Sequence, residues 1–427
     1  MAGLDLQAIE HELIDESWKG IPGGTQAFPL GELATRGWNV ARGDLPLPLL
    51  TLRRSAVEHN LAVMARFCAV TGVLLAPHGK TTMAPQLFDR QLAAGAWAIT
   101  AATVQQLQVY RRFGVPRVVL ANQVVGRAEL TWLAQQHAAG AFELWTLVDS
   151  AEAVERVAVV GERRPFPVLL ELGLPGGRTG ARDDRAVDGI LAAIDRTNGR
   201  VRLAGVEAFE GLIPQKRPAP PDPRVRQLVD RVAATATRLA AAGTLPDDFI
   251  LSAGGSVAFD LVAELLAPVA PAPARLVLRS GCYLTHDHGM YAGGSPLVHG
   301  ASSWAERVGV LRPALELWAH VQSQPEPGLA LLTFGKRDAP FDAGLPLPIR
   351  HVPDVANSDT ALDTADWSIS ALNDQHAYLR CPAGEEPRVG DRVVLGISHP
   401  CTAFDRWRLV YEVDDDDTVI GGIRTFF

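Results

Sequence analysis

Between about residues 50 and 280, the sequence alternates short apolar runs with longer amphipathic segments. Eight runs have the length and residue types of strands: 73–76, 98–101, 117–121, 143–148, 167–172, 203–208, 249–252 and 275–278. Most are followed by a segment in which apolar residues recur at helical spacing. Strands that alternate with helices pair in parallel through right-handed crossovers. Eight such units favour a (β/α)8 barrel over an open sheet.

The pattern changes after residue 291. Helical periodicity fades, and short β-like runs at 329–333, 377–380, 392–396 and 408–413 are separated by Gly, Pro and Asp. This texture is typical of a small antiparallel β domain. We therefore expect a barrel over 47–300 and a β domain over 301–427, with residues 1–46 packing on the latter. The acidic run at 414–417 is expected to be a solvated turn.

Charge and apolar patterning exclude several classes of protein. The chain has 48 acidic and 40 basic residues, a net charge of −8, and no Lys/Arg tract, which argues against nucleic-acid binding. No apolar segment is long enough to span a bilayer, and the first 20 residues do not resemble a signal peptide. Four scattered cysteines do not form a disulfide framework. We expect a cytoplasmic protein that acts on a small molecule.

One lysine stands at a position suited to chemistry. Lys80 follows the first expected strand, in the stretch Pro-His-Gly-Lys-Thr at 77–81. A surface lysine in a turn is the simpler interpretation, because most lysines are exposed. At the carboxyl end of a buried strand, however, a lysine can be desolvated and become available for Schiff-base chemistry.

Two glycine-containing loops follow other expected strands. Arg178 lies in the loop Gly-Arg-Thr-Gly at 177–180, after the fifth strand. Ser-Ala-Gly-Gly-Ser at 252–256 follows the seventh strand and opens a helix. Such a loop is often only a turn, but Gly254, Gly255 and Ser256 could hold a phosphate with their backbone N–H groups. Barrel phosphate sites favour the loops after strands seven and eight.

These segments, together with Arg-Ser-Gly-Cys-Tyr at 279–283, resemble in sequence and order the motifs of a known family. The family is that of the fold-type III pyridoxal-phosphate enzymes, in the D-serine dehydratase and D-threonine aldolase branch of the alanine racemase-like group. The resemblance extends over roughly residues 50–415. It implies that Lys80 binds the cofactor covalently, that Arg178 and the loop at Gly254, Gly255 and Ser256 contact it, and that Tyr283 touches its phosphate or ring.

The C-terminal part bears on the reaction. His399-Pro400-Cys401 alone is most simply a packed turn. The resemblance implies that His399 and Cys401 bind Zn²⁺, as in D-serine dehydratases of the eukaryotic type, where D-threonine aldolases generally have His-x-Asp. Thiolate prefers zinc, whereas carboxylate suits harder ions. We therefore expect zinc-assisted dehydration of D-serine or a related β-hydroxy D-amino acid to a 2-keto acid and ammonia. A metal-dependent D-threonine-type aldolase is the alternative.

Other positions and functions are less determined by the sequence. The resemblance places His376 near the substrate, as a catalytic residue that could assist proton transfer, although a structural role is about as plausible. Phe209 stands where the family commonly has tyrosine, and Thr-His-Asp-His at 285–288 could face the substrate or form a polar cluster, but is expected to be a solvated loop. A racemase or a cofactor carrier without turnover fits the C-terminal region less well. The family also implies a homodimer.

Overall fold

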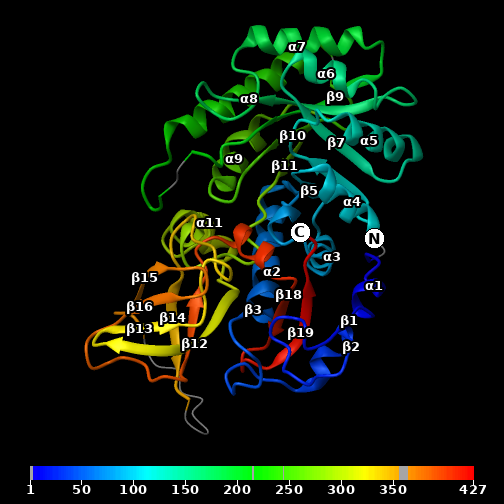
Figure 1. Ribbon diagram of the computed structural model, residues 1–427. Helices are drawn as coiled ribbons and strands as arrows, with labels where there is room; N and C mark the ends of the chain where they lie inside the picture. Colours follow the sequence, from blue (N-terminus) through cyan, green and yellow to red (C-terminus); the bar gives the residue numbers. More distant parts are fainter. Residues whose placement is uncertain (1–2, 214–215, 244, 355–363) are drawn as a thin grey trace.

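The computed structural model describes residues 3–213, 216–243, 245–354 and 364–427. Figure 1 shows two units, with the barrel above and a large mixed sheet below. The long helix α2 (Arg54–Thr71) lies between the barrel and the mixed sheet in this view. Among the helices that the model describes, none is long and apolar enough to cross a membrane.

The upper unit is built on eight parallel strands, as the sequence predicts. They are β4 (Leu74–Leu75), β5 (Ile99–Ala101), β6 (Arg117–Leu120), β7 (Glu143–Val148), β8 (Phe166–Leu172), β9 (Val201–Ala208), β10 (Ile250–Ala253) and β11 (Arg275–Leu278). Their order in the sheet is β4-β11-β10-β9-β8-β7-β6-β5. A parallel bridge between His78 and Thr100 joins the two ends, just beyond β4. The (β/α)8 fold class is therefore confirmed.

Helices follow the strands around this barrel. They are α3 (Pro85–Ala93), α4 (Val104–Arg112), α5 (Arg127–Ala139), α6 (Ala151–Val157), α7 (Asp184–Arg196), α8 (Pro223–Ala241) and α9 (Phe259–Leu266). The local sequence explains their limits. At α7, for example, the Asp183 side chain accepts a hydrogen bond from the Ala186 N–H, which caps the helix. Val187, Ile190 and Ile194 recur at helical spacing and are buried against the barrel.

The lower unit is a nine-stranded sheet. Its strands are β3 (Leu49–Arg53), β12 (Leu315–Glu326), β13 (Leu329–Leu332), β14 (Leu347–Val352), β15 (Ser368–Leu372), β16 (Ala377–Arg380), β17 (Arg392–Gly396), β18 (Leu409–Val413) and β19 (Val419–Arg424). Most of its pairs are antiparallel. Strand β3 pairs with β12 and, in parallel, with β18. Although β3 falls within the 47–300 range expected for the barrel, it therefore lies inside the second sheet.

The N-terminal residues lie beside this sheet in Figure 1. They contain α1 (Gln7–Glu10), the pair β1 (Leu13–Ile14) and β2 (Phe28–Pro29), and the 3-10 helix η1 (Leu30–Arg36). Leu30 and Leu33 of η1 are buried in a cluster that includes Leu49 of β3 and Tyr411 of β18. Hydrophobic contact thus joins the N-terminal residues to the C-terminal strands.

The acidic run at 414–417 is not wholly a solvated turn, which corrects the expectation from its charge. Asp417 is 5% exposed and contacts two arginines. The Arg53 Nη2 lies 2.8 Å from Asp417 Oδ1, and the Arg350 Nη1 lies 2.9 Å from Asp417 Oδ2. Both guanidinium groups also contact Glu316 of β12, at 2.8 and 3.1 Å. Two positive and two negative groups compensate one another, and this pairing lets Asp417 be buried.

Candidate active site

A cavity of about 450 Å³ opens at the carboxyl ends of the barrel strands. Loops after β4, β10 and β11 form one side of its wall. The segment 399–402 of the second unit forms another part. The residues lining it include His78, Lys80, Thr81, Gln106, Phe209, Gly255, Ser256, Val257, Arg279, Gly281, Cys282, Met290, Tyr291, His399, Cys401 and Thr402. The structure thus brings together groups that lie more than 300 residues apart in the sequence.

The lysine loop is fixed by close packing. Lys80 lies on the 3-10 turn Gly79–Thr81, directly after β4. A Cβ atom on Gly79 would come within 2.4 Å of the Tyr110 Oη and 2.8 Å of Ile99 Cγ2. Only glycine allows this approach. The Thr100 N–H also donates to the Pro77 carbonyl at 2.8 Å, so the turn is held against β5. Lys80 is therefore presented to the cavity by a rigid backbone.

The loop after β10 supplies free backbone donors. Gly254 has a φ of +86°, and a Cβ there would collide with Leu278 Cδ2 at 2.4 Å, so the sharp turn requires glycine. The N–H groups of Gly254 and Gly255 donate to the buried carboxylate of Glu210, at 3.2 and 2.5 Å. In the described part of the chain, the N–H groups of Ser256 and Val257 find no acceptor within the protein. These two groups, at the cavity wall, are available to an anion such as a phosphate.

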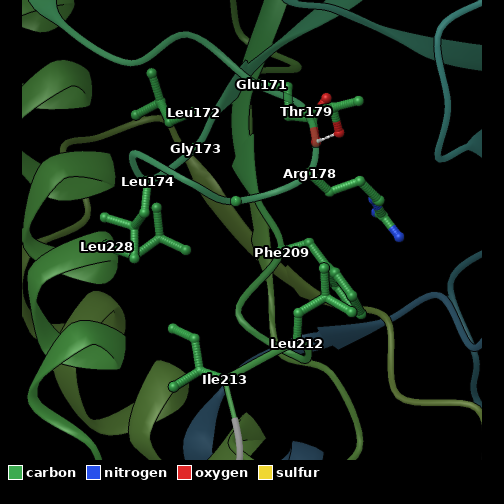
Figure 2. Close-up of a pocket in the computed structure, with 11 residues that line it drawn as sticks. Glu171, Leu172, Gly173, Leu174, Arg178, Thr179, Phe209, Leu212, Ile213 and Leu228 are labelled. Atoms are coloured by element: carbon green, nitrogen blue, oxygen red, sulfur yellow. Dashed lines mark hydrogen bonds between the residues drawn. The ribbon is translucent and has the colours of Figure 1, made fainter.

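The loop that carries Arg178 follows β8, which β9 separates from β10 in the sheet. Figure 2 shows Arg178 projecting away from Leu174 and Leu228, which line a small apolar pocket of about 60 Å³ behind the loop. The Thr179 hydroxyl donates to Glu171 Oε1 at 2.6 Å and anchors the loop. The Arg178 guanidinium lies 4.9 Å from the centre of the Phe209 ring. Phe209 therefore contacts Arg178 through its ring face, where the family's tyrosine would offer a hydroxyl.

A second cavity of about 120 Å³ lies next to Lys80 and is more polar. Lys80, His78, Arg178, Glu207 and Arg279 are among its lining residues. Glu207 is fully buried, and burial raises the pKa of its carboxyl to about 8, although Arg279 lies 2.8 Å away and opposes the shift. Neither Glu207 oxygen has a well-aligned hydrogen bond among the described residues. Burial lowers the pKa of His78 well below its usual range, and the nearby cations act in the same direction. Buried polar atoms of Glu207 and His78 without a hydrogen bond among the described residues suit a polar ligand that would complete their hydrogen bonds.

The two expected metal ligands lie together at the opposite wall. The segment that follows β17 carries His399 and Cys401, the latter in the short 3-10 turn Pro400–Thr402. Asp342 Oδ2 lies 2.6 Å from His399 Nδ1, and Asp342 Oδ1 accepts a hydrogen bond from the Thr402 hydroxyl at 2.8 Å. Hydrogen bonding to Cys401 first, and to Asp342 as well, raises the pKa of His399 to about 9. A carboxylate on Nδ1 leaves Nε2 as the nitrogen that could bind a metal ion.

Cys401 has a neighbour that the sequence did not single out. The Cys282 Sγ lies 3.3 Å from the Cys401 Sγ, and the Thr81 hydroxyl lies 3.2 Å from the latter. Hydrogen bonding from Cys282, and then from His399 and Thr81, lowers the pKa of the Cys401 thiol well below its usual range. Among the described residues, no three His, Cys, Asp or Glu side chains are arranged to hold a metal ion. His399 and Cys401 thus form a two-residue candidate site.

The segment 285–288 is buried, contrary to the expectation of a solvated loop. Thr285, His286 and Asp287 are each at most 2% exposed. The His288 N–H donates to the Ile397 carbonyl at 2.9 Å, and the Met290 N–H donates to the Ser398 carbonyl at 3.2 Å. These bonds pin the backbone directly before His399 to the loop that follows β11. The segment therefore docks the loop that carries His399 and Cys401 on the barrel.

Asp287 organises this docking segment. Its Oδ1 accepts hydrogen bonds from the N–H groups of Gly289, Tyr291 and Ala292, at 2.9, 2.9 and 3.2 Å. These bonds fix the start of the short helix α10 (Met290–Gly294) and place Tyr291 at the cavity. The second oxygen, Oδ2, is buried and has no hydrogen-bond partner among the described residues. Burial raises the pKa of this carboxyl to about 7.

Four expected site residues do not line the 450 Å³ cavity: Arg178, Gly254, Tyr283 and His376. Of these, Arg178 lines the adjoining 120 Å³ cavity. The Tyr283 hydroxyl is buried and lies 3.3 Å from Gln91 Nε2, beside a different cavity between α2 and α3. His376 is exposed, in the turn between β15 and β16, where its carbonyl accepts from the Asn373 N–H at 2.9 Å. In contrast, Tyr291 and Cys282 line the cavity and were not proposed from the sequence. Cys282 was visible only as part of the Arg-Ser-Gly-Cys-Tyr motif.

The chain is similar to several known proteins. A family described as a putative serine dehydratase domain matches residues 314–413. D-threonine aldolase from Arthrobacter sp. is 28% identical over 376 residues, which cover 87% of this chain and 89% of that protein. D-threo-3-hydroxyaspartate dehydratase from Delftia sp. (strain HT23) is 30% identical over 172 residues, or 39% of this chain and 44% of that protein.

The fold has a solved counterpart. The crystal structure of D-threonine aldolase from Filomicrobium marinum superimposes with a TM-score of 0.74 and 25% identity, and covers 91% of this chain and 96% of that chain. The barrel and the second sheet are therefore both shared with an enzyme of known activity.

Proposed function

We propose that this chain, which belongs to the fold-type III pyridoxal-phosphate family of D-serine dehydratases and D-threonine aldolases, is a zinc-assisted dehydratase of D-serine or a related β-hydroxy D-amino acid. One observation carries the proposal. His399 and Cys401 line the same 450 Å³ cavity as Lys80, Ser256 and Val257. A lysine amine, free anion donors and a thiolate–imidazole pair therefore surround one small space.

The residues on the barrel side fit the cofactor. Lys80 supplies the amine that would hold it, and the free N–H groups of Ser256 and Val257 suit its phosphate. Arg178 and the Glu207–Arg279 pair would border its ring, since they line the adjoining 120 Å³ cavity. When bound, pyridoxal phosphate supplies an electron sink that lowers the barrier to removal of the substrate α-proton. Nζ of Lys80 is the cavity base positioned to take that proton.

The residues on the opposite side fit a zinc ion. His399 and Cys401 give one nitrogen and one sulfur ligand, and sulfur favours zinc over magnesium or manganese. A bound zinc ion would act as a Lewis acid on the β-hydroxyl of the substrate. Two protein ligands leave positions open for substrate oxygens.

The second candidate is a D-threonine-type aldolase. It would cleave the Cα–Cβ bond to give glycine and an aldehyde. Similarity to D-threonine aldolase covers 87% of this chain, against 39% for the dehydratase relative, and this favours the candidate. The Cys401 sulfur in place of a carboxylate argues against it, because the harder metal ions prefer oxygen ligands.

The two candidates give different products. The purified protein is incubated with D-serine, D-threonine and D-threo-3-hydroxyaspartate, with and without a strong chelator, and keto acid, ammonia, glycine and aldehyde are measured. The proposal expects keto acid and ammonia, lost on chelation and restored by zinc. Glycine and aldehyde as the main products would establish the aldolase instead. Full keto-acid formation after rigorous metal removal would overturn the role of zinc.

A further inference from the structure

The two cysteines at the cavity wall are closer than non-bonded sulfur atoms ordinarily lie. The Cys282 Sγ and Cys401 Sγ are 3.3 Å apart, and both thiols are free. Their backbones belong to different units, because Cys282 follows β11 of the barrel and Cys401 follows β17 of the second sheet. The Thr81 hydroxyl contacts both sulfur atoms, at 3.2 Å from Cys401 and 3.9 Å from Cys282. The site therefore holds two thiols in direct contact.

The sulfur–sulfur distance of 3.3 Å lies between that of two thiolates on one zinc ion and that of a disulfide. Two thiolates on one tetrahedral zinc, each about 2.3 Å from the ion, lie about 3.8 Å apart. A disulfide needs a sulfur–sulfur distance of about 2.05 Å, so the pair must close by roughly 1.3 Å. Both cysteines lie in loops, where a shift of this size is easiest.

Access to the pair is asymmetric. Both cysteines line the cavity, but Cys401 is partly exposed whereas Cys282 is only 4% exposed. A small oxidant that enters the cavity would therefore meet the more exposed Cys401 first, with Cys282 in place beside it. Of the other two cysteines, Cys68 lies on α2 and Cys381 follows β16, and no contact between them is seen in the described residues. In the pair at the cavity, Cys401 therefore corresponds to an attacking thiol and Cys282 to a resolving thiol.

We infer that Cys282 and Cys401 form an oxidisable thiol pair, in which a disulfide withdraws Cys401 from the metal site. With hydrogen peroxide as oxidant, the Cys401 sulfur attacks one peroxide oxygen to give a sulfenic acid, and the first water leaves. The Cys282 sulfur then attacks the Cys401 sulfur, the S–S bond forms, and the sulfenic hydroxyl departs as a second water. Two thiols and one peroxide thus give one disulfide and two waters.

The thiol pair itself rests on the sulfur geometry, but its effect on the metal rests on the proposed function. A thiolate bound to zinc is less available to an oxidant, and a sulfur in a disulfide is no longer a thiolate ligand. Metal binding and disulfide formation therefore compete for Cys401. The metal-free protein is the form open to oxidation, and reduction restores it.

The test uses full-length protein with Cys68→Ser and Cys381→Ser, which leaves only the pair. Zinc-loaded and chelator-treated samples receive one equivalent of hydrogen peroxide, and thiols are counted after denaturation. We expect loss of both thiols in the metal-free sample only, a peptide containing Cys282 joined to Cys401 in the mass spectrum, and at least a tenfold fall in zinc affinity that dithiothreitol reverses. Added Cys282→Ser, or Cys282→Ala if the first variant misfolds, should instead leave Cys401 as a sulfenic or sulfinic acid.

Two outcomes would overturn the inference. The thiol pair fails if folded metal-free protein keeps both thiols, or if each is oxidised singly without a cross-link. The competition fails if the disulfide forms while zinc affinity is unchanged, and this would also remove Cys401 as a ligand. The product assay is separate: a protein that shows the disulfide and the zinc effect but makes no keto acid contradicts only the proposed function.

Discussion

The two walls of the cavity are built in different ways. On the barrel wall, Lys80 and Ser256 follow parallel strands, and the carboxyl ends of such strands meet at one edge whatever the side chains are. On the opposite wall, His399 and Cys401 follow an antiparallel strand, and hydrogen bonds between residues 288–290 and 397–398 hold the end of this strand against the barrel. Topology brings the residues of the first wall to one edge, whereas the position of the second wall depends on contacts between the two units. Substitutions in the second sheet should therefore disturb the geometry of the barrel wall less than that of the opposite wall, which carries His399 and Cys401.

The largest expected effect tests the barrel wall. Lys80→Ala removes the cavity amine that would hold the cofactor, so activity should fall by roughly a thousandfold or more. The visible absorbance that borohydride alters should disappear as well. Steady-state rates and absorption spectra measure both effects, with Lys336→Ala, on the second sheet's side, as the matched control. An unchanged borohydride-sensitive spectrum in Lys80→Ala would remove this residue from its proposed role.

The next effect tests the metal wall through a residue that does not itself bind the metal. Asp342→Ala removes the carboxylate on His399 Nδ1, so zinc affinity should fall by about 10- to 100-fold. Activity should recover when zinc is saturating. Competition with a chromophoric chelator measures the zinc affinity. Asp342→Asn keeps an acceptor oxygen, so its zinc affinity should lie between those of the parent protein and Asp342→Ala. Asp374→Asn on a remote turn is the control, and equal affinities in all four proteins would separate Asp342 from the metal.

The smallest effect concerns the docking segment and pH. Burial raises the pKa of Asp287 from 3.8 to about 7 in the folded protein. Below about pH 4 the carboxyl is protonated whether folded or unfolded. Between about pH 4 and 7 the unfolded protein releases this proton while the folded protein keeps it, so stability decreases as the pH rises through this window and levels off above it. Asp287→Asn keeps the acceptor for three N–H groups and never ionises. Between pH 5 and 8 its free energy of unfolding should therefore decrease by about 2 kcal/mol less than that of the parent protein.

Denaturant unfolding of the metal-free protein at several pH values measures this difference in stability. The control is Asp195→Asn, at an exposed position on α7. Parallel stability curves for the parent and Asp287→Asn would show that the Asp287 carboxyl does not titrate in this window. That result would also weaken the contrast between the two walls of the cavity. Ionisation of Asp287 would then not destabilise the segment that holds the loop of His399 and Cys401 on the barrel.

The sequence predicts the first wall well, for a physical reason. Strand and helix periodicity are local, and all eight barrel strands lie within a few residues of their expected ranges. Once the strands are parallel, Lys80 and the loop around Ser256 must share one face. Strand and helix periodicity does not predict, however, which backbone N–H groups of this loop remain without an acceptor. Glu210 occupies the N–H groups of Gly254 and Gly255, and this leaves those of Ser256 and Val257.

The second wall was less predictable because its determinants are long-range. Thr285, His286 and Asp287 are polar, and polar residues in a loop suggest solvent, yet packing against the second sheet buries them. Asp417 was misread for the same reason, since the arginines that neutralise it come from β3 and β14. The contact between Cys282 and Cys401 joins residues 119 positions apart and leaves no local pattern.

The place of β3 in the second sheet has a consequence for the order of events during synthesis. Arg53 at its end contacts Glu316 and Asp417, which lie 263 and 364 residues later in the chain. A nascent chain therefore exposes β3 while all eight barrel strands are made, and its neighbours β12 and β18 arrive only afterwards. Contacts of such long range form late. The barrel wall of the cavity can thus form on the ribosome before the opposite wall, which is complete only when translation has passed β17 and the loop beyond it.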